Sequence, residues 1–346
     1  MTSTLDKDPQ LILHHVHRYI LSCQRADGAI LWFEDGKLDP WDHTEAAMGL
    51  SINGDFKGFR HAFDWLINIQ NSDGSWFAKY YGALTDEDLD RAKIETNFVA
   101  YPACGLWHYF LISQDIDYVQ RAFPYIEKAI NFVLSHQSEE GDIQWACSSQ
   151  ETLPKDALIT ACASILRSLE CAIMLAERLD IPHTWTPHYI KLADTLKNKP
   201  WRFDRTWEPK TRFSMDWFYP ILSGIYSKEE AQQRLNVRWD EFVHPEYGCR
   251  CVNDEPWVTI AESCELTLAL IASGQQSKAH KLFNQLLRWQ DEDGGFWTGY
   301  TYRDKVIWPK EKTTWTAAAT LLALDALENI TPASTLFTTE SGLTHL

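Results

Sequence analysis

The sequence lacks the features that mark several classes of protein. No cluster of Lys and Arg offsets its acidity, since 48 Asp and Glu residues stand against 32 Lys and Arg, for a formal net charge of −16. We therefore expect no nucleic-acid partner. The chain has no uncharged apolar run of about 18 residues and its first residues are polar, so neither a membrane span nor a signal peptide is expected. These absences favour a cytoplasmic protein.

Motifs for phosphate and metal chemistry are missing as well. The sequence contains no P-loop, GxGxxG or GxSxG phrase, and no acidic run long enough to hold Mg²⁺ with a diphosphate. Cys249-Arg-Cys251 lacks the partner spacing of a zinc site. The eight cysteines are scattered, most of them in apolar stretches, which indicates reduced thiols rather than disulfides. We expect no metal and no cofactor.

Tryptophan, by contrast, is abundant, with 16 copies, and one short phrase recurs. The phrase is Gln-x-x-acid-Gly, and it begins at Gln24, Gln70, Gln137 and Gln290. Each copy follows an amphipathic stretch and precedes aromatic residues. Because Gly readily adopts the left-handed conformation that ends a helix, each copy predicts a helix end followed by a turn.

Two kinds of helical pattern alternate between these turns. One kind has a polar face, and we expect outer helices at 11–24, 55–70, 115–137, 185–197, 227–242 and 276–290. The other is rich in Ala, Leu and Ile, and we expect inner helices at 41–50, 95–110, 157–175, 216–225, 261–272 and 313–327. This alternation predicts an all-α fold, an (α/α)6 double barrel, as one domain over residues 1–335. Residues 336–346 are predicted to be a flexible C-terminal tail.

Two segments carry a resemblance to a known family. The stretch from Phe63 to Trp76 resembles the QW motif of the squalene–hopene and oxidosqualene cyclases, and 283–297 is a looser copy. Asp39-Pro-Trp-Asp42 is similar to the start of the first inner helix in their catalytic domain. The chain thus resembles class II terpene cyclases, most closely the monodomain cyclases of the merosterolic acid synthase kind. The resemblance implies the terpenoid cyclase toroid and a metal-independent isomerase that cyclises a polyprenyl chain, with or without an aromatic head group, after protonating it.

The sequence departs from that family at its DxDD acid motif, which is absent. Ile94 stands at the position of the proton-donating Asp, whereas Glu95 and Thr96 match the last Asp of the motif and the Thr that follows it. Either another carboxylic acid donates the proton, or the protein is not a class II cyclase.

Proton donation to an alkene requires a carboxylic acid that burial keeps protonated, and the inner-helix starts carry the candidates. Asp42 and Glu262 have the spacing of helix caps, which gives both a structural explanation. The leading hypothesis is therefore a donor drawn from Asp216 and Glu95 as a pair across the barrel. Asp42 with Glu45, one turn further along the same face, is the second.

Side chains near the same helix starts are expected to line the cavity. The aromatic ones would stabilise positive charge in a substrate. The expected substrate-binding set is Trp41, Trp76, Phe98, Tyr101, Trp217, Tyr219, Glu262, Trp297 and Trp315.

Three functions remain open from the sequence. The cyclase hypothesis predicts a hydrophobic isoprenoid substrate, a dry cavity and peripheral contact with a membrane. The alternative is a carbohydrate-active (α/α)6-barrel enzyme, in which paired carboxylates about 5–10 Å apart flank a glycosidic bond and indoles stack on sugars. The third is a carrier of prenyl groups or lipids without catalysis.

Overall fold

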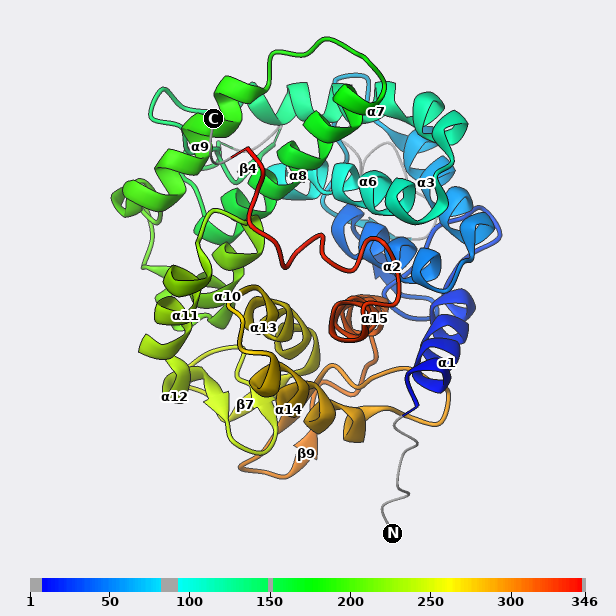
Figure 1. The fold of residues 1–346 in the computed structure, drawn as a ribbon, viewed down its shortest axis with the longest axis vertical. Helices are drawn as coiled ribbons and strands as arrows, with labels where there is room; N and C mark the ends of the chain where they lie inside the picture. Colours follow the sequence, from blue (N-terminus) through cyan, green and yellow to red (C-terminus); the bar gives the residue numbers. More distant parts are fainter. Residues whose placement is uncertain (1–7, 82–92, 149–151, 344–346) are drawn as a thin grey trace.

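The computed structural model describes residues 8–81, 93–148 and 152–343, whose helices form two concentric rings (Figure 1). The inner ring consists of α2 (Pro40–Ile52), α5 (Thr96–Ala100) with α6 (Pro102–Ser113), α8 (Ile159–Arg178), α10 (Ser214–Phe218) with η3 (Tyr219–Ser223), α13 (Ile260–Ala272) and α15 (Thr314–Glu328). The outer ring consists of α1 (Pro9–Ser22), α3 (Phe56–Ile69), α7 (Ile116–Leu134), α9 (Thr186–Asn198), α11 (Lys228–Val237) with α12 (Trp239–Phe242), and α14 (Gln276–Leu286). The predicted α/α barrel is confirmed.

Burial explains why the two helix types alternate. Every residue of α2 is buried, and so is almost every residue of α15, because both are surrounded by other helices. On α3 only one stripe is buried, which includes Phe59, Phe63 and Leu66. The distribution of apolar residues around a helix therefore indicates whether that helix lies in the inner or the outer ring.

Two inner helices are broken where one continuous helix was expected. In each, a five-residue helix ends at a tyrosine that is followed by proline, at Tyr101-Pro102 and Tyr219-Pro220. Proline has no N–H to continue the hydrogen-bond ladder, so the axis changes there. Both tyrosines are buried.

The recurring Gln-x-x-acid-Gly phrase is a joint between neighbouring outer helices. The Gln70 side chain donates to the carbonyl of Gly74 within its own turn (3.0 Å) and to that of Tyr125 on α7 (2.9 Å). Gln24 and Gln137 each reach the next outer helix in the same way. The fourth turn, at Gly294, lies against His15 on α1, so it joins the last helix pair to the first. The phrase is thus a feature of barrel closure.

Short antiparallel ladders connect the loops that lead into the inner helices. β1 (Lys37–Leu38) pairs with β2 (Tyr80–Tyr81), β3 (Ile94–Glu95) with β4 (Ala146–Cys147), and β5 (Val243–His244) with β6 (Gly248–Cys249). β8 (Gly299–Thr301) lies between β7 (Trp257–Thr259) and β9 (Val306–Ile307). Three of these pairings link the approach to one inner helix with the approach to another, so they hold neighbouring helix starts in register.

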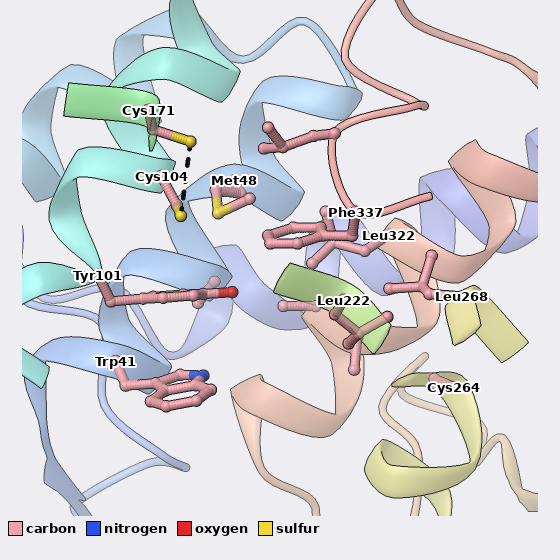
Figure 2. Close-up of a cluster of buried hydrophobic side chains, with 14 of the residues drawn as sticks. Trp41, Met48, Tyr101, Cys104, Cys171, Leu222, Cys264, Leu268, Leu322 and Phe337 are labelled. Atoms are coloured by element: carbon pink, nitrogen blue, oxygen red, sulfur yellow. Dashed lines mark hydrogen bonds between the residues drawn. The ribbon is translucent and has the colours of Figure 1, made fainter. Parts of the chain in front are cut away.

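The far end of the barrel, where the inner helices finish, is closed by the C-terminal segment. Figure 1 shows this segment, in red, crossing the centre of the ring, and Figure 2 shows Phe337 beside Leu322 of α15 and near Met48 of α2. Leu336 and Phe337 are buried, and Arg167 donates to the carbonyl of Thr339 (3.0 Å). The prediction of a flexible tail is wrong for 336–343, because this segment covers apolar helix ends; 344–346 lie outside the described residues.

One described helix is long and apolar enough to cross a membrane. This is α8, and 83% of its most apolar window is buried inside the protein. The length and composition of α8 therefore suit its place in the inner ring.

We predict that Gly294→Ala destabilises the ring closure. Gly294 has φ +94°, and a Cβ there would lie 2.3 Å from the carbonyl oxygen of His15. We expect a loss of about 2–4 kcal/mol in the free energy of unfolding, measured by denaturant titration. Gly54→Ala is the matched control, since it has φ +74° but nothing within 4 Å of the added Cβ; it should cost only about 1–2 kcal/mol. Equal losses in the two variants would contradict the closure argument.

Candidate functional site

A cavity of about 330 Å³ lies where the inner helices begin. Residues from the approaches to α2, α5, α8, α10 and α15 line it. They are Trp32, Asp39, Trp41, Asp42, Glu95, Asn97, Phe98, Leu158, Thr160, Ala161, Met215, Thr298, Glu311, Thr313 and Trp315. The lining combines carboxyl groups with large aromatic rings.

Asp39 anchors the first turn of α2. Its Oδ1 accepts from the N–H of Asp42 (2.9 Å) as the helix cap, and its Oδ2 accepts from Trp32 Nε1 (2.9 Å). Burial raises the pKa of Asp39 to about 6, although both hydrogen bonds act against this shift. Because both oxygens are engaged, Asp39 fixes the position of its neighbours at the cavity wall.

Asp42 lies one turn inside this cap and lines the cavity directly. Its side chain has no hydrogen-bond donor among the described residues, and the residue is 8% exposed. Burial raises the pKa of Asp42 well above its usual value, and the charges of Asp39 and Glu45 raise it further. Asp42 is thus a buried carboxyl group beside an accessible cavity, in surroundings that favour its protonated form.

Glu262 occupies the equivalent position on α13. It is the third residue of that helix, as Asp42 is of α2, and it is 7% exposed. The first N–H of α13, from Ile260, donates to the carbonyl of Thr298 (3.1 Å), a cavity-lining residue. Burial raises the pKa of Glu262. The start of α13 therefore brings a second buried carboxyl group to the end of the barrel that holds the cavity.

Two further carboxyl groups, both more exposed than that of Asp42, complete the lining. Glu95 makes an ion pair with Lys93 (2.7 Å) and its side chain is 20% exposed. Glu311 precedes α15, and its backbone carbonyl accepts from Thr298 (3.0 Å). Both bring a further carboxyl group to the cavity wall.

The aromatic walls come from three elements. Trp41 meets Phe98 edge to face, with ring centroids 6.0 Å apart. Lys37 Nζ lies 3.7 Å above the ring of Trp32, and Trp315 stands in the first turn of α15. Flat apolar rings next to carboxyl groups suit a ligand with both apolar and hydroxyl-bearing faces.

The pair of Asp216 and Glu95 expected from the sequence does not form. Met215 faces the cavity, whereas Asp216 lines a separate groove of about 580 Å³ between outer helices, together with Arg234 and Arg238. Burial raises the pKa of Asp216 to about 6. The hypothesis fails because the short helix α10 turns Asp216 away from the cavity that Glu95 lines.

The other expected site residues divide into lining and packing positions. Trp41, Phe98 and Trp315 line the cavity, as do Asp42 and Glu95. The remaining ones do not: Trp76 is packed in its turn and donates to the carbonyl of Leu66, Trp217 stacks on Phe242, and Trp297 lies beside Lys312. Glu262 is buried at the start of α13, and Glu45, Tyr101 and Tyr219 are buried in the core.

Sequence reasoning missed Trp32, Thr298 and Glu311, and it did not name Asp39 as a site residue. Asp39 and Glu311 stand directly before the starts of α2 and α15, which was a usable signal, whereas Trp32 and Thr298 lie further back in the loops that lead to these helices. As for metals, no group of three or more His, Cys, Asp or Glu side chains suited to hold an ion is found in the described part of the chain.

Comparisons with known proteins point to carbohydrates. The chain is 42% identical over 319 residues to the MMP endo-(1,4)-3-O-methyl-alpha-D-mannosidase of Mycolicibacterium hassiacum, covering 92% of this chain and 86% of that protein. No protein-family model matches the chain. Its fold is similar to that of a D-mannose isomerase, with a TM-score of 0.73 and 13% identity over 95% of this chain and 100% of that chain. It is also similar to the GH63 mannosylglycerate hydrolase from Thermus thermophilus, with a TM-score of 0.65 and 12% identity over 90% of this chain and 99% of that chain.

These findings overturn the cyclase interpretation. The relative is a glycosidase, and the similar structures act on sugars by their names, so the terpene cyclase family, its isomerase reaction and its isoprenoid substrate are wrong for this chain. The prediction of an enzyme holds, and the carbohydrate-active alternative is the one favoured. The QW-like turn misled because it serves to join outer helices in the barrel.

Proposed function

Because this chain belongs to the family of the Mycolicibacterium hassiacum mannosidase, we propose that it is a glycoside hydrolase cleaving internal (1,4) linkages in chains of 3-O-methyl-α-D-mannose. The observation that carries the proposal is the buried Asp42 carboxyl group, whose pKa burial raises, at the wall of a cavity lined by acids and indoles. Glycoside hydrolysis needs such a group, since the leaving oxygen must receive a proton as its bond to C1 breaks.

We assign the proton donor to Asp42. Burial and the neighbouring acids keep it neutral, so it can give its proton to the glycosidic oxygen. The Asp42 anion left behind is stabilised by the N-terminal end of α2, whose dipole favours negative charge. Because Asp42 carries this negative charge only after it has given up its proton, the helix dipole stabilises the product of the proton transfer.

Glu262 is assigned as the second carboxyl group. It starts α13 as Asp42 starts α2, so the sugar would lie between two helix ends. In its ionised form Glu262 would take the proton of a water molecule that adds to C1, and the atoms then balance as one water consumed for each linkage cleaved. Glu311, which lines the cavity, is the other acid that could serve in this role.

The indoles supply the remaining recognition. Trp32, Trp41 and Trp315 present apolar faces to the cavity. A 3-O-methyl group adds apolar surface to a mannose ring, which such faces bind better than a fully hydroxylated one.

We predict that Asp42→Asn abolishes hydrolysis while the protein stays folded. A loss of at least about a hundredfold in kcat is expected, because the amide cannot donate an acidic proton. Glu262→Gln should lose a similar factor. Asp216→Asn is the matched control, since Asp216 is also a buried acid of raised pKa but lies in the outer groove. Release of reducing ends from a methylated α-(1,4)-mannan measures the rates. Full activity in Asp42→Asn would overturn the assignment.

A second prediction concerns the aromatic walls. Trp315→Ala should raise KM for a methylated mannan about tenfold and change kcat less, because the ring contributes binding to ground state and transition state alike. Trp201→Ala serves as the control, since Trp201 is 68% exposed and lies outside the cavity lining. An unchanged KM in Trp315→Ala would show that this ring does not contact the sugar.

A further inference from the structure

A buried acid lies directly beneath the cavity wall on α2. Glu45, 2% exposed, is one turn further along the helix than Asp42. Its Oε2 accepts from Trp41 Nε1 (3.0 Å) and from the Tyr101 hydroxyl (3.1 Å). The two rings also lie face to face (Figure 2). Their centroids are 4.7 Å apart and their planes 17° from parallel. Glu45 therefore holds the indole that lines the cavity.

A second acid, Glu265 on α13, faces Glu45. It lies one turn beyond Glu262 and is 4% exposed, and its Oε2 has no hydrogen-bond partner within the described residues. Burial raises its pKa well above the usual value, and the charge of Glu45 raises it further. Two neighbouring buried carboxyl groups resist ionising together, so the charge of either one disfavours charge on the other.

The same spacing therefore occurs twice, on two helices of one ring. Asp42 and Glu45 follow the cap of α2, and Glu262 and Glu265 follow the cap of α13, each pair three residues apart. The tyrosines of the two Tyr-Pro breaks complete the surroundings of Glu45 and Glu265. Tyr101 and Tyr219 both lie close enough to these two acids for the charges of the acids to raise the pKa of each tyrosine. In the upper pair, Asp42 lines the cavity and Glu262 is buried at the start of α13; the lower pair, Glu45 and Glu265, lies in the core.

The charges around Glu45 come from each inner element packed there. The side chains involved on α2 and its cap are Asp42 and Asp39, and those on α13 are Cys264 and Glu265. Tyr101 and Cys104 lie at the break between α5 and α6, and Tyr219 begins η3. On α15 the titratable residues are Asp325 and Glu328, near its other end. His43 points to the outer ring, where its nitrogens contact the Ile30 N–H and the Ala62 carbonyl. Around Glu45 the described residues thus supply acids and no cation.

A cation, Lys37, acts on Asp42 instead. Lys37 of β1 lowers the pKa of Asp42, but this effect is smaller than that of burial and of the charges of Asp39 and Glu45. The protonation of Asp42 therefore depends on the acids beneath and beside it.

We propose that Glu45 and Glu265 are a positioning pair that fixes the Trp41 platform and whose negative charge acts on the proton of Asp42 in the hydrolysis proposed above. Burial raises the pKa of Glu45 to about 7, so the pair is neutral in acid and carries its charge at neutral and higher pH. A nearby anion raises the pKa of Asp42, so its charge extends the active range of the donor toward alkaline pH.

The test is the pH profile of kcat/KM for Glu45→Gln. The variant keeps an oxygen for Trp41 and Tyr101 but loses the charge, so Asp42 should lose its proton at lower pH. We expect the alkaline limb to move down by about one pH unit. Asp325→Asn is the matched control, because burial raises the pKa of Asp325 to about 6 but it lies at the far end of α15, and its profile should superpose on that of the wild type. A uniform loss of activity with the limb in place would overturn the proposal.

A second measurement does not require hydrolysis. An acid whose pKa is raised on folding costs stability as pH rises from its unfolded pKa to its folded pKa. Glu45, with a folded pKa of about 7, therefore lowers the stability of the fold progressively up to about pH 7 and by a constant amount above it. Glu45→Gln should therefore raise Tm relative to wild type by about 3 °C more at pH 8.5 than at pH 5. If no glycan is cleaved but this difference appears, the proposed function fails and the acid pair stands. If hydrolysis depends on Asp42 but the Tm of Glu45→Gln changes equally at both pH values, the proposed acid pair is refuted and the proposed function stands.

Discussion

The structure depends on one constraint, which is that a ring of helix pairs must close on itself. Each Gln-x-x-acid-Gly turn sets one outer helix against the next, with its glycine close to the neighbouring backbone. At three of the four turns the glutamine amide also donates a hydrogen bond across the joint. The joint at Gly294 returns the last pair to α1. Once the ring is closed, the inner helices begin at one end and their first turns meet there, where the short ladders hold them.

That convergence explains why acids gather at one end. The start of a helix offers unpaired N–H groups and a favourable field for negative charge, while the surrounding core withholds water. Asp39 accepts a helix N–H and becomes an anchor, whereas the Asp42 side chain does not, and burial raises its pKa well above the usual value. The opposing effects of burial and helix field thus divide neighbouring acids into structural and chemical roles.

The fold could be predicted from the sequence because helix amphipathicity depends directly on position in the two rings. The site was predicted only in part. Asp42, Glu95, Trp41, Phe98 and Trp315 were named and line the cavity, but Asp216 was preferred for lack of a capping explanation, and a five-residue helix turns it outward. Orientation within so short a helix is not encoded in periodicity. The C-terminal segment was misjudged for a related reason: its polar composition hides Leu336 and Phe337, whose burial depends on surfaces made by distant helices.

Closure through Gly294 also sets how such a chain can vary. An open stack of repeats can gain or lose a unit at either terminus, because each unit needs only its neighbours. Here the joint of the final pair is made against the opening helix, so removal of any one pair would leave a gap that the remaining helices could not span without changing every crossing angle. Diversity within this architecture should therefore accumulate in the loops at the entrance to the inner helices, and the number of pairs should stay constant.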